Sequence, residues 1–172
     1  MIASVRGRPV GVSRSEYTYM ALPNDANPLG NVMGGRVMHL VDMCGSFAAL
    51  RHARLPVVTA SVDQMCFLHP VTIGQLLVLR SSVNRVSRTS MEVGVKVWVE
   101  NPRTGKILHT SSAYLTFVAI DEAGKPAPIV PVIAESDEDE RRYSDAGRRR
   151  EYRLAACKAT SSVTTSAPEL AR

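Results

Sequence analysis

The chain has 172 residues, 45% of them hydrophobic and 5% aromatic, which suits one ordinary domain with a modest core. Its three cysteines are odd in number and show no Cys-x-x-Cys spacing, so we expect no disulfide framework and no structural zinc. No stretch resembles a signal peptide, and none has the roughly 20 consecutive apolar residues that a membrane span needs. We therefore expect a cytoplasmic protein with no membrane partner. The formal net charge of +5 suits a polyanionic partner, but no recognition helix, zinc finger or aromatic-basic RNA motif accompanies it, so we expect no nucleic-acid partner.

The first part of the chain predicts a strand, a polar loop and a long buried helix. Residues 1–14 are basic, contain Gly and Pro, and are expected to be flexible. Residues 15–22 are compatible with a short strand, and residues 23–31 form a loop rich in Asn, Asp, Pro and Gly. From Gly34 and Gly35 onward, apolar residues recur at spacings of three and four through about five turns, which predicts a helix buried against a sheet.

Strand patterns dominate the next part of the chain. We expect strands over residues 57–67, 74–86, 89–100 and 106–121, with a hairpin loop over 101–105. The short loops between them predict antiparallel pairing, and one buried helix followed by such strands predicts an α+β layer fold. The clearest alternation places Met91, Val93, Val95, Val97 and Val99 on one face of a strand.

The C-terminal part predicts a linker, a charged helix and a tail. Residues 126–131 are rich in Pro, and residues 134–154 are expected to form a helix whose clustered acidic and basic residues pair with one another in solvent. Residues 155–172 are mostly Ala, Ser and Thr and are predicted to be disordered. The folded domain is therefore expected over residues 15–133.

Several short motifs occur in an order and near a spacing that resemble a known family, over roughly residues 15–130. They are Met20–Asn27, Gly30–Gly35, Leu40–Asp42, Arg51–His52, Val58–Asp63, Phe67 with Pro70 and Gly74, Arg88–Val93, and Glu100–Asn101 with Thr104–Gly105. Together they resemble the cytosolic acyl-CoA thioesterase branch of the hotdog fold.

The resemblance implies a hotdog fold, in which an antiparallel sheet wraps a long central helix, here followed by the charged C-terminal helix. It implies hydrolysis of acyl-CoA to free fatty acid and coenzyme A without a metal or an organic cofactor. It also implies self-association. Two hotdogs pair into a homodimer with the active sites at their interface, and three such dimers form a homohexamer.

The family's catalytic pair is an asparagine before the Gly-Gly turn and an acidic residue in the helix, which match Asn27 and Asp42. Asp42 could deprotonate the attacking water or attack the thioester directly, and we favour the general base. Without the resemblance, Asp42 is better interpreted as a structural aspartate bonded to a neighbouring strand. Asn24 and Asn31 lie in the same loop, and Asn31 is the alternative to Asn27.

The start of the helix and the start of one strand supply the remaining candidate residues. Gly34 and Gly35 leave backbone N–H groups unpaired at the positive end of a helix dipole, where they could form an oxyanion hole or simply allow a tight entry to the helix. The resemblance assigns Arg88, Thr89 and Ser90 to coenzyme A, with Arg88 on a phosphate. Alternatively, these three are ordinary hairpin residues.

Two other functions are alternatives to thioester hydrolysis. A hydratase or dehydratase on the same fold uses an aspartate and a histidine in one motif, and the loop here contains Asp25 but no histidine. A non-catalytic acyl-CoA-binding protein has no need of a catalytic pair, so the presence of both Asn27 and Asp42 favours the enzyme.

Overall fold

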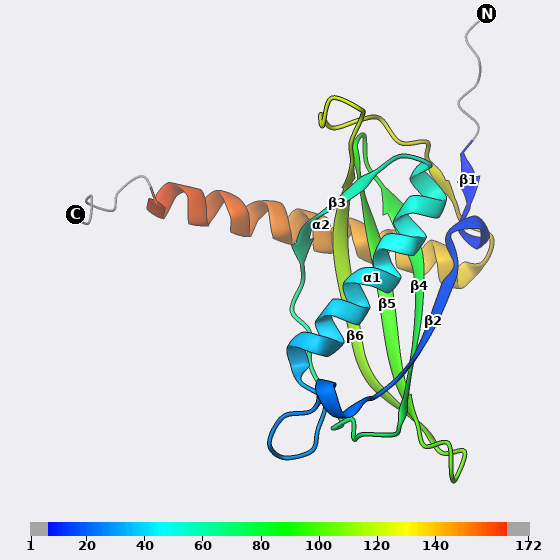
Figure 1. Ribbon diagram of the computed structural model, residues 1–172. Helices are drawn as coiled ribbons and strands as arrows, with labels where there is room; N and C mark the ends of the chain where they lie inside the picture. The colour runs from blue at the N-terminus through cyan, green and yellow to red at the C-terminus, as the bar shows by residue number, and fades with distance from the viewer. Residues whose placement is uncertain (1–6, 165–172) are drawn as a thin grey trace, which may run out of the picture.

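The computed structural model describes residues 7–164, with side chains as far as Cys157. A curled antiparallel sheet of five strands, in the order β2-β4-β5-β6-β3, lies between two helices. Helix α1 (Gly34–Ala53) fills the inner face of the sheet, and helix α2 (Asp137–Thr164) crosses the outer face (Figure 1). The strands are β2 (Ser15–Met20), β3 (Val57–Val62), β4 (Leu76–Val86), β5 (Ser90–Glu100) and β6 (Ile107–Ala119). This is the predicted α+β layer fold, with a long helix wrapped by an antiparallel sheet.

The core lies between α1 and the inner face of the sheet. The alternating valines of β5 point inward and are buried, as the period of two in their sequence predicts. The helix approaches the sheet closely at Gly45, where a Cβ atom would lie 3.2 Å from the ring of the buried Phe117. A side chain at this position would therefore require the Phe117 ring or the helix to shift slightly.

Two segments that are distant in the sequence contact the C-terminal end of α1. The buried His52 contacts the Val130 carbonyl oxygen through Nε2 at 3.0 Å, and Arg8 donates a hydrogen bond to the His52 carbonyl. Burial lowers the pKa of His52 below its ordinary value, the hydrogen bond to Val130 partly opposes this, and the nearby charge of Arg8 adds to the decrease. The helix then ends at Arg54, which adopts the left-handed conformation with φ of 58°.

Part of the segment that we predicted to be flexible belongs to the folded body. Strand β1 (Arg8–Pro9) pairs in parallel with β7 (Val132–Ile133), and a 3₁₀ turn, η1 (Val10–Ser13), follows it. The hydroxyl of the buried Ser13 accepts a hydrogen bond from the Val83 N–H at 3.0 Å. The prediction of flexibility is therefore wrong for residues 8–13, because backbone pairing and burial hold them. Residues 1–6 lie outside the described residues.

Helix α2 continues to Thr164, ten residues past the predicted end at 154. The segment after Leu154 contains Ala and Lys, which are strong helix formers and favour continuation of the helix. The prediction of disorder is therefore wrong for residues 155–164. Residues 165–172 of the predicted tail lie outside the described residues.

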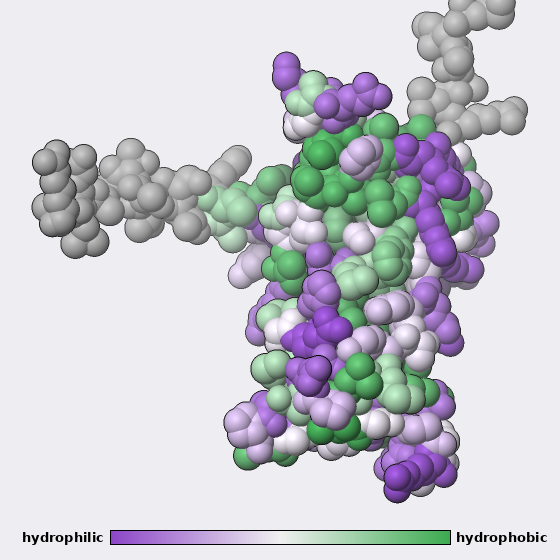
Figure 2. Space-filling model, viewed as in Figure 1, coloured by the Kyte–Doolittle hydropathy of each residue, from purple (hydrophilic) through white to green (hydrophobic). Residues whose placement is uncertain are grey.

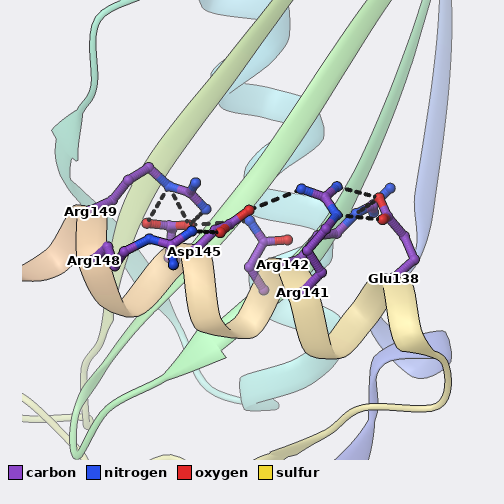
Figure 3. A network of polar contacts seen from close by, with 8 residues as sticks. Glu138, Arg141, Arg142, Asp145, Arg148 and Arg149 are labelled. Atoms are coloured by element: carbon purple, nitrogen blue, oxygen red, sulfur yellow. Dashed lines mark hydrogen bonds and ion pairs between the residues drawn. The ribbon is translucent and has the colours of Figure 1, made fainter.

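The charges of α2 pair along the helix, as predicted. Glu138 accepts hydrogen bonds from Arg141 and Arg142, each at 2.8 Å, and Asp145 pairs with Arg141 at 2.9 Å and with Arg148 (Figure 3). The hydrogen bonds from the two arginines lower the pKa of Glu138 to about 2. These exposed pairs at i,i+3 and i,i+4 support the helix itself.

Helix α2 is anchored to the outer face of the sheet by buried charges. The carboxylate of Glu92 on β5, only 4% exposed, accepts from Arg149 at 2.7 Å and from Arg153 at 3.0 Å. Arg153 also pairs with Asp63 at 2.7 Å, and the Arg149 guanidinium lies 3.6 Å from the centre of the Tyr114 ring. This network fixes α2 across β5 and β6.

Strand β3 ends at Val62, five residues before the predicted end at Phe67, and a loop then runs to β4. In the part of the chain that the structure describes, no helix is both long and apolar enough to cross a membrane. No cluster of three or more His, Cys, Asp or Glu side chains among residues 7–157 is arranged to hold a metal ion.

Candidate active site

Asp42 is the ninth residue of α1, in the third turn of the helix. Its side chain is half-buried, and its Oδ1 accepts a hydrogen bond from the Thr59 hydroxyl on β3 at 2.7 Å. Thr59 is a residue that the sequence reasoning missed as part of the site, although the motif over residues 58–63 contains it. The hydrogen bond holds one carboxylate oxygen in place and leaves the other available to water.

Asn27 forms the turn that precedes α1. Its side-chain Oδ1 accepts from the N–H groups of Leu29 and Asn31, at 3.0 and 3.2 Å, and its own N–H donates to the Asn31 carbonyl at 2.7 Å. Gly30 completes the turn with φ of 77°, a conformation that favours glycine. Asn31 pairs with Thr72 through the backbone. The side-chain amide N–H groups of Asn27 have no partner among the described residues, so they remain available as donors.

The N-terminus of α1 is open. Among residues 7–164, no acceptor lies opposite the backbone N–H groups of Gly34 and Gly35. A Cβ atom at Gly35 would meet nothing within 4 Å, and one at Gly34 would lie 3.5 Å from the Phe67 ring. Two exposed apolar side chains lie at this end of the helix: Met33, which caps it, and Phe67, whose ring lies beside Gly34. The site thus offers two free donors beside an apolar surface.

Within one protomer, the structure does not bring the predicted catalytic residues together. Asp42 follows Gly34 by eight residues, which corresponds to about 12 Å along a helix axis. Asn27 and Asp42 share no hydrogen bond. A base must lie within hydrogen-bond reach of the water that it activates, so the Asp42 carboxylate and the N–H groups of Gly34 and Gly35 cannot act on one thioester from the same protomer.

Arg88 and Thr89 lie at the opposite end of the sheet from the start of α1, and Ser90 begins β5 there. The loop before α1 pairs with the segment leading into β4, through the Val32 N–H and the Val71 carbonyl at 2.7 Å. Arg88 follows the C-terminal end of β4, which lies about 33 Å from the N-terminal end of the same strand. Its side chain is exposed and has no hydrogen bond or ion pair with the described residues, while its carbonyl accepts from Ile129 at 3.0 Å.

The face that carries α1 has an unpaired strand edge. Strand β3 is at the edge of the sheet, and Val62 on it is 50% exposed. Met38 on α1 is 47% exposed. Figure 2 shows hydrophobic residues on this face, gathered over the C-terminal end of α1 and mixed with polar residues elsewhere. An exposed strand edge beside apolar side chains is typical of a surface that pairs with another chain.

Two surface cavities of 620 and 770 Å³ flank α2 on the outer face of the sheet. The larger is lined in part by Ser90, but neither is lined by Asn27, Asp42 or Gly34. These two cavities are therefore separate from the candidate site.

The chain is similar to known proteins both in sequence and in structure. The sequence profile of the thioesterase superfamily matches residues 29–106. The uncharacterized acyl-CoA thioester hydrolase YkhA of Bacillus subtilis is 38% identical over 137 residues, which cover 80% of each chain. The crystal structure of an apo-hexameric acyl-CoA thioesterase has a TM-score of 0.85 and 39% identity, and covers 88% of this chain and 97% of its own.

An acyl-CoA hydrolase of Staphylococcus aureus, solved in complex with butyryl coenzyme A, coenzyme A and coenzyme A disulfide, has a TM-score of 0.87 and 30% identity, and covers 93% of this chain and 98% of its own. Three further structures of that enzyme replace an aspartate, a threonine and an asparagine by alanine. The fold is thus the predicted hotdog fold, and the chain belongs to the acyl-CoA thioester hydrolases of the thioesterase superfamily.

Proposed function

We propose that the protein hydrolyses acyl-CoA to free fatty acid and coenzyme A, at a site shared by two protomers. The observation that carries the proposal is the Asp42–Thr59 hydrogen bond on the face of α1 that lies beside the unpaired β3 edge. Family membership supports the substrate class. The residue types replaced in the S. aureus structures, Asp, Thr and Asn, are those of Asp42, Thr59 and Asn27.

In this mechanism, Asp42 is the general base. Its free carboxylate oxygen removes a proton from water as the water oxygen attacks the thioester carbonyl carbon. The negative charge that develops on the carbonyl oxygen is stabilised by the backbone N–H groups of Gly34 and Gly35 and by the helix dipole. The Asn27 amide donates to the same oxygen or orients the water. Collapse of the tetrahedral intermediate breaks the C–S bond, and the coenzyme A thiolate takes up the proton that Asp42 removed from water, which restores the Asp42 carboxylate.

A two-fold axis near Met38 would assemble this site. Met38 lies four residues from both Gly34 and Asp42 on α1, so antiparallel helices crossing there place Gly34 of one protomer opposite the partner subunit's Asp42. The exposed Met38 side chain and the β3 edge would be buried in the same contact. Each dimer then has two equivalent sites. The hexameric structure at 39% identity supports the further assembly of three dimers.

The same geometry explains the distant position of Arg88. In an antiparallel pair, the end of one sheet that carries Arg88 lies toward the end of the other protomer where α1 begins. Arg88, Thr89 and Ser90 can therefore bind the phosphates of a coenzyme A whose thioester lies at the partner's Gly34. Arginine suits this role because its fork grips phosphate with two hydrogen bonds.

The proposed reaction requires no cofactor, since the polarising donors are backbone N–H groups and the base is a carboxylate. Cys44 and Cys66 carry free thiols, which favours the reducing environment of the cytoplasm.

A thiol-release assay tests the proposal. The purified chain is incubated with acyl-CoA of two to sixteen carbons, and free thiol is followed with a chromogenic disulfide. We expect turnover on at least one chain length and its loss in Asp42→Asn. Binding of acyl-CoA without thiol release at every length would show a non-catalytic binding protein instead.

A further inference from the structure

A buried charged cluster lies behind the loop that carries Asn27. Asp25 is only 5% exposed. Its Oδ2 accepts from the Tyr19 hydroxyl at 2.9 Å and from the Leu22 N–H at 2.8 Å, and its Oδ1 accepts from Arg36 Nε at 2.8 Å. Arg36 also donates to the Tyr19 hydroxyl oxygen at 2.9 Å. Tyr19, Asp25 and Arg36, called here the Asp25 cluster, therefore form a closed ring of hydrogen bonds.

The Asp25 cluster joins three elements at the candidate site. Tyr19 is on β2, Asp25 ends the 3₁₀ turn η2 (Pro23–Asp25) just before Asn27, and Arg36 is in the first turn of α1. The Asp25 carbonyl also accepts the N–H of Met33, the residue that caps α1, at 2.8 Å. Side-chain and backbone contacts thus fix both ends of the loop against the helix start, where the free N–H groups of Gly34 and Gly35 lie.

The charges of the Asp25 cluster are electrostatically favourable at the N-terminus of α1. The first turn of α1 contains Arg36 and no acidic residue, which is unfavourable at the positive end of the helix dipole. Asp25 supplies a negative charge from outside the helix, and Arg36 in turn balances that charge. An unbalanced carboxylate at this place would oppose the negative charge that develops on the thioester oxygen.

Asp25 is not itself suited to proton transfer. Burial alone would raise its pKa, but the hydrogen bonds from Leu22 and Tyr19 and the charge of Arg36 together outweigh burial, so the pKa lies below the ordinary value. The carboxylate remains ionised at neutral pH, and both of its oxygens are occupied. Its contribution is geometric.

We propose that Tyr19, Asp25 and Arg36 are positioning residues for thioester hydrolysis, which hold the Asn27 amide and the Gly34 and Gly35 N–H groups in register around the reacting carbonyl. This rests on the proposed function. The donors act mainly on charge that exists in the transition state, so their displacement lowers kcat more than it raises KM.

The test measures kcat and KM for acyl-CoA in Asp25→Asn, Asn27→Ala and the double variant. Asp25→Asn should lower kcat by about ten- to a hundredfold, the range expected for a small misplacement of catalytic groups, and change KM by less than about threefold. In the Asn27→Ala background, the same substitution should have a clearly smaller effect, because one of the groups that it positions is already absent.

Two variants serve as controls. Glu16→Gln breaks an exposed ion pair with Arg80 on the same strand, β2, and should leave kcat unchanged. Tyr19→Phe removes one hydroxyl and keeps the Asp25–Arg36 ion pair, so it tests the proposal even if Asp25→Asn does not fold. It should lower kcat without a comparable change in KM.

The outcomes separate the positioning role from the proposed function. If Asn27→Ala lowers kcat while folded Asp25→Asn and Tyr19→Phe do not, the cluster is only structural, and the positioning role is refuted while the proposed function stands. If Asn27→Ala leaves kcat unchanged, its assigned role in the proposed function fails, and the positioning proposal fails with it. Equal effects of Asp25→Asn with and without Asn27 would also refute action through this loop.

Discussion

Replacing Asp42 by Asn changes the chemistry of the candidate site and leaves its shape almost intact. The asparagine Oδ1 can still accept the hydrogen bond that Thr59 donates at 2.7 Å in the native protein. What is lost is the negative charge that takes a proton from water. General-base catalysis contributes about 10²- to 10⁴-fold to a rate, which corresponds to about 3–5 kcal/mol of activation free energy.

Thr59→Val separates orientation of Asp42 from its basicity. The substitution removes one hydrogen bond to a carboxylate, which contributes about 1.5–3 kcal/mol when buried. Because Asp42 is only half-buried, we expect the lower end of this range, or about a tenfold decrease in kcat. Both variants are assayed by thiol release at saturating acyl-CoA, with thermal unfolding to verify the fold. A folded Asp42→Asn protein whose kcat is within threefold of the native value would refute the assignment of Asp42 as the base.

Three further predictions concern stability, pH and substrate binding. Glu92→Ala leaves Arg149 without its buried partner and should lower the free energy of unfolding, measured by urea titration, by about 3–5 kcal/mol. Glu16→Ala, which breaks an exposed ion pair, should lower it by at most about 1 kcal/mol. Similar decreases for the two variants would contradict the anchoring of α2. Because burial lowers the pKa of His52 in the folded state below the ordinary 6.5, its contribution to stability is complete above pH 6.5 and is lost as the pH falls through the folded pKa. The melting temperature should therefore fall with acidification below this pH, and His52→Gln should show a flatter profile; parallel profiles would contradict this. Arg88→Ala should raise KM for acyl-CoA several-fold and leave acyl-pantetheine, which lacks the nucleotide phosphates, little changed; equal effects on both substrates would remove Arg88 from the binding site.

Local periodicity in the sequence predicted most of the fold. Apolar spacing of three and four located the start of α1 at Gly34, and the alternating valines located β5 to within one residue. Both patterns reflect burial against the neighbouring layer. The end of α2 was misplaced because helix propensity, and not apolar periodicity, maintains an exposed helix beyond Leu154.

The candidate site was predictable only in part. Motif resemblance supplied Asn27 and Asp42, but a threonine on a strand carries no sign that it bonds to an aspartate 17 residues earlier, so Thr59 was missed. The sequence offers Asp25 only as the aspartate of a possible hydratase motif, because its contacts with Tyr19 and Arg36 depend on how β2 and α1 pack. The separation of Arg88 from Gly34 follows from strand direction, which motif order does not convey.

The central claim is that each site combines Asn27 of one protomer with Asp42 of the other, and coexpression of two chains of low activity tests it most directly. Asn27→Ala and Asp42→Asn chains, each of low activity alone, are produced together with different affinity tags and assayed for thiol release. If the site is shared, a mixed dimer contains one intact site and one doubly altered site, so a random mixture should recover about a quarter of the native activity. Activity no higher than that of either variant alone, with mixed dimers demonstrated by tandem purification, would contradict a site shared between protomers.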